Sequence, residues 1–299
     1  MRVSEQQRYN TTINRVEKAK QNNSKMLEVM STNKTLNHIS DDPVGAARVI
    51  RGRERIESYR QYQKNIDFAV GYIEKAESSI RSIHDFLVRA KELAVGMSNA
   101  TYDAKGRKLV SEEVKEVMNA VVQLGNTTYG NRYVFGGFRT QTPPLARDGG
   151  YLGDDGAFYM QIDENSFRQI NVQARSLFEA SEDERKLRHF DMIESLRVLY
   201  DGLKDNNVES IRLAMDELEF QLQKAASYEA SLGTIHNAIN DARERLELGE
   251  ELTQKNLSKV EDADMYKSVS QFKKTETILQ STLMASNKLL QPSLLNFMQ

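Results

Sequence analysis

Residues 66–97 decide the fold, and they read IDFAVGYIEKAESSIRSIHDFLVRAKELAVGM. Apolar residues recur there in two series with a spacing of seven, and the second series begins three residues after the first. The first is Ile66, Ile73, Ile80, Leu87 and Ala94, and the second is Ala69, Ala76, Ile83, Ala90 and Met97. Positions three and four apart share one face of an α-helix, and a repeat of seven is typical of helices that pack lengthwise. At a rise of 1.5 Å per residue, the stretch predicts one helix of roughly 48 Å.

A second stretch, in the C-terminal third, carries the same repeat. The residues spaced by seven are Ile211, Leu218, Ala225, Leu232, Ile239 and Leu246. A companion series starts with Met215 and Leu222 but is interrupted by Glu229 and His236. We therefore expect two long helical arms packed along one seam, which makes the fold mainly α. The predicted seam residues are Ile66, Ile73, Ile80, Ile83, Leu87, Leu218, Leu232 and Leu246.

The segment between the arms has a different composition. Seven of the sixteen glycines lie in 130–156, together with Pro143 and Pro144. Further on, YMQI and FRQINV flank the polar residues 163–166, a pattern that predicts a β-hairpin. The sequence thus predicts a helical-bundle rod made by the two arms, with a small inserted β domain. We place the rod at 43–137 and 181–262 and the β domain at 138–180.

The two ends of the chain have weaker apolar stripes than the arms. Asn23 interrupts the N-terminal stripe, while the C-terminal stripe is broad and the chain finishes LLNFM over 294–298. Such ends indicate segments that order only in an assembly, and we predict terminal coiled-coil segments over 1–42 and 263–299. The alternative is that the two ends pair with each other in a monomer.

Local signals mark three helix starts. Asp42 before Pro43 places a carboxylate at an N-cap and a proline at the first helical position. Ser181 with Glu184 predicts a capping box for a helix containing Phe190, Ile193 and Leu196, and Asn206 with Glu209 predicts another.

Charge is distributed unevenly along the chain, although the net charge is only −2. Residues 1–65 hold thirteen Lys/Arg and seven Asp/Glu, a local charge of +6, whereas 201–262 hold seven and fourteen, a local −7. The basic N-terminal segment is complementary to the acidic helix, within the chain or between chains. A nucleic-acid-binding arm is the alternative, but the cations are spread along the helical repeat and not clustered.

Signatures of catalysis, cofactors and membrane insertion are missing from the sequence. The chain of 299 residues has no Cys, its four histidines are far apart, and no HExxH, GxSxG or phosphate-binding glycine loop occurs. No apolar run is long enough to span a bilayer, and the first twenty residues lack the apolar core of a secretory signal peptide. We expect no enzyme activity, no catalytic or metal-binding residues, no cofactor, no nucleic acid and no membrane insertion.

Several motifs resemble one family of bacterial proteins. The octapeptide 40–47, SDDPVGAA, with Asp41, Asp42 and Pro43, looks like the signature of flagellar hook-associated proteins of the hook–filament junction (FlgL type), within the flagellin-like superfamily. NTTYGNRYVFGG over 126–137 resembles that family's motif where the rod enters the outer domain, and its Tyr133, Phe135, Gly136 and Gly137 are the expected domain-junction residues. The segments 151–156, 161–162 and 170–172 are similar to the hairpin of the family's β domain.

The resemblance implies a structural role outside the cell. It implies a homo-oligomeric ring of subunits that joins hook to filament, with another hook-associated protein on the hook side and flagellin on the filament side. It also implies export by the flagellar type III apparatus without a cleaved signal peptide, and an export chaperone. The assembly and chaperone end would include Leu290, Leu294, Leu295 and Phe297. A flagellin-type filament subunit is the alternative within the superfamily, and a chemosensory coiled coil or an enzyme is the alternative outside it.

Overall fold

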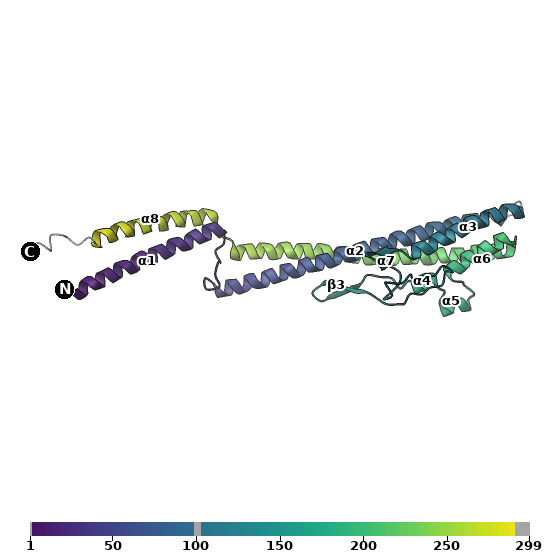
Figure 1. The fold of residues 1–299 in the computed structure, drawn as a ribbon, viewed down its shortest axis with the longest axis horizontal. Coiled ribbons are helices and arrows are strands. Elements are labelled where there is room, and N and C mark those ends of the chain that lie inside the picture. The colour runs from purple at the N-terminus through teal and green to yellow at the C-terminus, as the bar shows by residue number, and fades with distance from the viewer. Residues whose placement is uncertain (1, 99–102, 291–299) are drawn as a thin grey trace, which may run out of the picture. The chain divides into compact units, whose positions relative to one another are not determined.

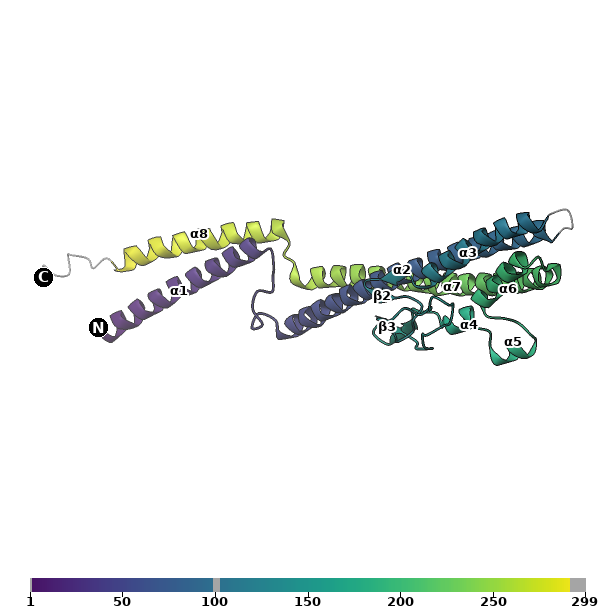
Figure 2. The same cartoon turned by 45° about the vertical axis from the view of Figure 1, so that its right-hand side comes forward.

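The computed structural model describes residues 2–98 and 103–290, with side chains for 6–98 and 103–288. Long helices dominate, and two small antiparallel strand pairs come between the third and fourth helices in the sequence (Figures 1 and 2). The elements are α1 (Arg2–Thr32), α2 (Pro43–Met97), α3 (Ala104–Gly125), β1 (Thr128–Tyr129), β2 (Arg132–Tyr133), β3 (Tyr159–Asp163), β4 (Ser166–Gln169), α4 (Arg175–Phe178), α5 (Glu182–Lys186), α6 (Met192–Lys204), α7 (Val208–Glu261) and α8 (Met265–Leu290). The predicted class, mainly α with a small β region, is confirmed. Within the described residues, no helix combines the length and the apolar character needed to cross a membrane.

The chain forms two compact units that divide α2 and α7 between them. Unit 1 holds the residues up to Ser58 together with those from Leu248 onward, and unit 2 is Tyr59–Glu247. The three-part division expected from the sequence, at 42/43, 137/138, 180/181 and 262/263, stays a prediction.

Unit 2 contains a continuous hydrophobic core. Every predicted seam residue contributes to this core and is at most 3% exposed. These residues are Ile66, Ile73, Ile80, Ile83, Leu87, Leu218, Leu232 and Leu246. The core also takes in one face of α3, through Val114, Val117 and Val121, and α3 packs along α6. The spacing of seven in both arms is therefore accounted for by burial against neighbouring helices.

Two polar residues interrupt the second arm's companion series, and both have partners on α2. The Glu229 carboxylate lies 3.1 Å from the Arg81 guanidinium, and the His236 ring lies 3.8 Å from the Glu77 carboxylate. These two polar side chains lie at the edge of the seam, where polar partners on α2 face them.

The β region follows α3. The pair β1–β2 places Tyr129 opposite Arg132, with Gly130 and Asn131 between them in left-handed conformations, as a tight two-residue hairpin requires. The pair β3–β4 is the hairpin expected from the sequence, with Glu164 and Asn165 at its turn. The longer hairpin buries Ile162 on one face.

Two of the expected helix starts need correction. The capping box of Ser181 and Glu184 is present, but it caps the short helix α5, and Phe190 lies outside any helix. The chain leaves α5 through Arg188 in the left-handed conformation and restarts helically at Met192. The cap of α7 is Asn207 and not Asn206, because the Asn207 Oδ1 accepts the backbone N–H groups of Glu209 and Ser210.

Unit 1 is built around the pair α1–α8. The two helices run antiparallel and lie side by side in both views (Figures 1 and 2). Asn23, which interrupts the N-terminal stripe, is 3.3 Å from the Thr275 hydroxyl of α8. The buried hydrophobic residues of this unit are few among those described: Ala19, Val29, Val49 and Ile56. Unit 1 therefore has much less core than unit 2.

Candidate functional site

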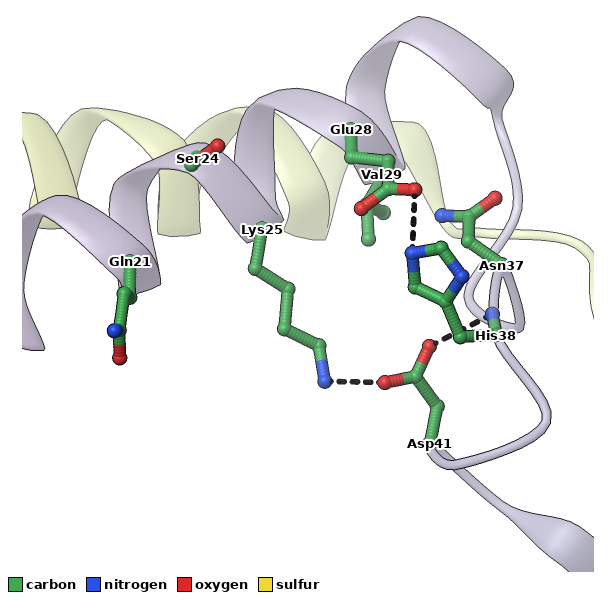
Figure 3. A pocket seen from close by; sticks show the side chains of 8 residues that line it. All are labelled: Gln21, Ser24, Lys25, Glu28, Val29, Asn37, His38 and Asp41. Atoms are coloured by element: carbon green, nitrogen blue, oxygen red, sulfur yellow. Dashed lines mark hydrogen bonds and ion pairs between the residues drawn. The ribbon is translucent and has the colours of Figure 1, made fainter.

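The segment between α1 and α2, residues 33–42, folds back against α1 and encloses a small pocket (Figure 3). The pocket measures about 290 Å³ and is lined by Gln21, Ser24, Lys25, Glu28, Val29, Asn37, His38 and Asp41. Figure 3 shows two contacts that cross it, one from Lys25 to Asp41 at 2.7 Å and one from His38 to Glu28 at 3.1 Å. These contacts hold the connecting segment to the end of α1.

Each residue of the motif at 41–43 has a different structural role. Asp41 accepts the Lys25 ammonium on one oxygen and the His38 backbone N–H on the other, and both hydrogen bonds lower the pKa of the Asp41 carboxyl. Asp42 accepts the Val44 backbone N–H at 3.0 Å, which is N-capping geometry for α2. Pro43 is the first residue of α2, where its missing N–H leaves no hydrogen bond unmade.

Glu261, the last residue of α7, joins three segments of unit 1. Its carboxylate pairs with Lys34 and with Arg53 of α2, although the side chain is only 6% exposed. Its backbone oxygen accepts the Thr35 N–H at 2.8 Å. On the following turn, Ala263 donates its N–H to the Asn33 oxygen at 2.9 Å. No local sequence pattern indicates this cluster, because its partners lie more than 200 residues apart.

The expected domain-junction residues lie in one hydrogen-bonded corner of unit 2. Tyr133 is half-buried and Phe135, Gly136 and Gly137 are buried. The ring of Phe135 packs edge-on against Phe178, and its backbone oxygen accepts the Tyr151 hydroxyl at 2.7 Å.

Gly137 is needed for conformation. It adopts φ +63°, and a Cβ at this position would come within 2.2 Å of the Asp154 backbone oxygen. Any L-residue there would be strained and would clash. The corner thus packs and positions the β region, and it contains no reactive group.

The apolar end of the chain is only partly described. Leu290 is the last residue of α8, and its side chain lies outside the described residues, as do Leu294, Leu295 and Phe297 altogether. Their expected part in assembly and chaperone binding stays a prediction.

Large apolar side chains are exposed along the described part of unit 1. They are Tyr9, Leu27, Ile39, Val44, Ile50, Leu248, Leu252, Met265, Tyr266, Ile278, Leu283 and Met284. Exposure of so many apolar groups on a unit with so little core is typical of a surface that is covered by other chains.

In the part of the chain that the structure describes, no arrangement suited to catalysis accompanies these surfaces. Among the described residues, no three His, Cys, Asp or Glu side chains come together in a way that fits a metal ion. His189 stacks on Phe220 and lies 3.1 Å from the Glu217 carboxylate, which also accepts the Phe190 N–H. That contact fixes the chain between α5 and α6. A second pocket, of about 530 Å³, is lined by Asn126, Arg139, Thr142, Pro143, Leu145, Ala146, Arg147 and Leu152 and holds no nucleophile–base pair.

Comparison with known proteins gives a consistent result. The family model of the bacterial flagellin N-terminal helical region matches residues 3–140, and that of the C-terminal helical region matches 215–298. Flagellar hook-associated protein 3 of Escherichia coli is 26% identical over 95% of this chain and 96% of its own length. A flagellin of Halalkalibacterium halodurans is 24% identical over 86% of this chain and 84% of its own.

Solved structures show the same fold. A putative flagellar hook-associated protein from Vibrio parahaemolyticus superposes with a TM-score of 0.68 at 14% identity, over 74% of this chain and all of that one. The two family models together span more than half of the residues, and they include the repeat of 66–97 and most of the repeat that ends at Leu246. The chain belongs to the flagellin-like superfamily, and it is a structural component of the bacterial flagellum and not an enzyme.

Proposed function

We propose that this protein is the junction subunit that connects the flagellar hook to the filament. The observation that carries the proposal is the similarity to flagellar hook-associated protein 3 along nearly the whole of both chains. The strands of the β region have at most five residues, and such a small middle domain also fits a junction subunit.

The subunit would act as a ring of identical copies. On the hook side it would contact another hook-associated protein, and on the filament side it would contact flagellin. The exposed apolar side chains of unit 1 support this role, since burial against neighbouring copies would stabilise helices that have little core of their own. The surfaces of unit 2 would then be available for side-by-side contacts between copies in the ring.

Export would use the flagellum's own type III apparatus. A chaperone would hold the apolar C-terminal end until assembly, and removal of residues 290–299 should abolish chaperone binding. Copurification of the chaperone with the full chain but not with the shortened chain measures this expectation.

A deletion strain tests the proposal. Loss of the junction should leave hooks without filaments, with flagellin secreted into the medium, as electron microscopy and analysis of the medium would show. The same strain carrying the gene on a plasmid is the control and should regain filaments. If the protein were instead the filament subunit, the deletion would remove the main filament protein from the medium as well. Filaments of normal length in the deletion strain would refute both roles.

A further inference from the structure

Three arginines on one face of α2 have no partner within the described chain. Arg48, Arg51 and Arg55 are three and four residues apart, so they share one side of the helix, and all three are exposed. None forms an ion pair with another described residue. Arg53, which points toward a different side, is the arginine that pairs with Glu261.

Three carboxylates on α7 are in the matching situation. Asp241, Glu244 and Glu247 are exposed, and in the part of the chain that the structure describes none of them forms an ion pair. The helix buries Ala242 and Leu246 on its other side, so the carboxylates point outward. Of the nearby cations on α7, Arg243 is already paired with Asp67. Arg245 is exposed on the edge of the same face and leaves it net negative.

The chain thus neutralises only part of its basic and acidic arms internally. Lys91 pairs with Glu219, Arg81 with Glu229 and Arg243 with Asp67, all between α2 and α7. The arginines of α2 and the carboxylates of α7 described above are among the charges that remain without an ion pair in the described chain. Uncompensated faces of opposite sign on one chain favour contacts between copies of it.

The two faces also match in length. From Arg48 to Arg55 is seven residues, or roughly 10 Å of helix, and from Asp241 to Glu247 is six, or roughly 9 Å. They are different surfaces, and contact between different surfaces of identical subunits produces a ring or a helical array instead of a closed dimer. We propose that the arginine face of α2 in one copy packs against the carboxylate face of α7 in a second copy within the assembled flagellum. This inference rests on the proposed function, because it names a contact inside the subunit ring.

Charge reversal provides the first test, in flagella assembled from the full chain. The variant R51E/R55E should lower the number of filaments per cell at least about tenfold, because like charges then face each other across the contact. The matched control is K105E/K108E on α3, which changes two exposed lysines three residues apart and alters net charge equally. Circular dichroism melting of the purified variants should show that both fold as the parent does.

Reversal of the opposite face provides the second test. D241K/E244K alone should also lose filaments, and R51E/R55E/D241K/E244K should recover them because the attraction is restored with its signs exchanged. Equal behaviour of R51E/R55E and K105E/K108E, or no recovery in the combined variant, would overturn the contact.

Cross-linking reads out the contact directly. Because the chain has no cysteine, the variant R51C/E244C carries the only two thiols available. Oxidation of its isolated flagella should give disulfide-linked oligomers, and neither single variant should give more than background. Absence of oligomers in flagella that assemble normally would overturn the proposal. That outcome leaves the junction role standing if the deletion strain lacks filaments, so the two failures are distinguishable.

Discussion

At the scale of single residues, the seam of α2 has a direct test at Ile80, which has no exposed surface. Ile80→Asp would place an unpaired carboxylate among aliphatic side chains, and the expected loss of unfolding free energy is about 3–5 kcal/mol. The neighbouring Ser78 is exposed, so Ser78→Asp is the control and should change stability by less than about 0.5 kcal/mol. Denaturant unfolding followed by circular dichroism measures both, and an Ile80→Asp chain as stable as the control would remove Ile80 from the core.

The cap of α2 belongs to the same scale. Asp42 accepts the Val44 N–H, so Asp42→Ala should cost about 1 kcal/mol. Asp42→Asn retains an acceptor and should cost at most a few tenths of a kcal/mol. The denaturation midpoints of the two variants measure these losses of stability. An unchanged midpoint for Asp42→Ala would contradict the capping role.

A buried tyrosine makes the stability of the core depend on pH. The Tyr72 hydroxyl donates to the Val134 oxygen at 2.6 Å, and burial raises the pKa of Tyr72 from 10.0 to about 12. Because the pKa is higher in the folded than in the unfolded state, the contribution of Tyr72 to the free energy of unfolding is complete below pH 10. It is lost as the pH rises toward 12. Tyr72→Phe should therefore cost about 1 kcal/mol at neutral pH, with the difference shrinking above the ordinary tyrosine pKa. Tyr266→Phe, at an exposed site, should be neutral throughout, and a Tyr72→Phe penalty that stays constant through alkaline pH would refute the linkage.

At the scale of elements, the end of α7 joins the connecting segment and α2 within unit 1. Glu261→Gln keeps the shape of the side chain but removes its charge, and the ion pairs with Lys34 and Arg53 should weaken by about 1–3 kcal/mol. The amides of residues 33–35 should then exchange with solvent faster, as hydrogen exchange with mass spectrometry measures. Glu251→Gln is the matched control, since its exposed pair with Lys255 contributes little. Equal exchange in the two variants would show that Glu261 does not fix the connecting segment.

The elements that could be predicted are those with a local cause. The repeat of seven in α2 and α7 and the polar turn of β3–β4 depend on residues close together in the sequence. The structure contains the two long helices and the hairpin at the expected positions. The boundary errors at Asn206 and Phe190 have one reason. At each place a residue in the left-handed conformation follows the end of a helix, Arg188 after α5 and Asn206 after α6, and the next helix begins only beyond it.

Long-range contacts escaped prediction. The pairing of Glu261 with Lys34 and Arg53, and of Asp41 with Lys25, depends on which segments the fold brings together. The sequence did indicate that a basic region and an acidic helix complement each other, but only the structure separates the charges that are paired from those that are not.

At the scale of the whole molecule, stability is distributed unevenly. The continuous hydrophobic core lies within unit 2, whereas the described part of unit 1 buries few apolar side chains and exposes many. Ordering each residue costs roughly 1–2 kcal/mol of backbone entropy, and a helix pair with little core offsets this cost poorly. Segments with few buried contacts are the first to open.

Limited proteolysis of the isolated subunit should therefore remove α1 and α8 early and leave a stable fragment of about 43–262. Mass spectrometry of the products gives the cleavage sites, and circular dichroism of the fragment should show the helicity of α2 and α7 retained. Assembled flagella provide the control, because burial of Leu27, Ile278 and Leu283 against neighbouring copies should protect the same bonds. Uniform resistance of the isolated chain through α8 would mean that α1 and α8 already form a finished pair without partners. The exposed apolar side chains of unit 1 would then need another explanation than assembly.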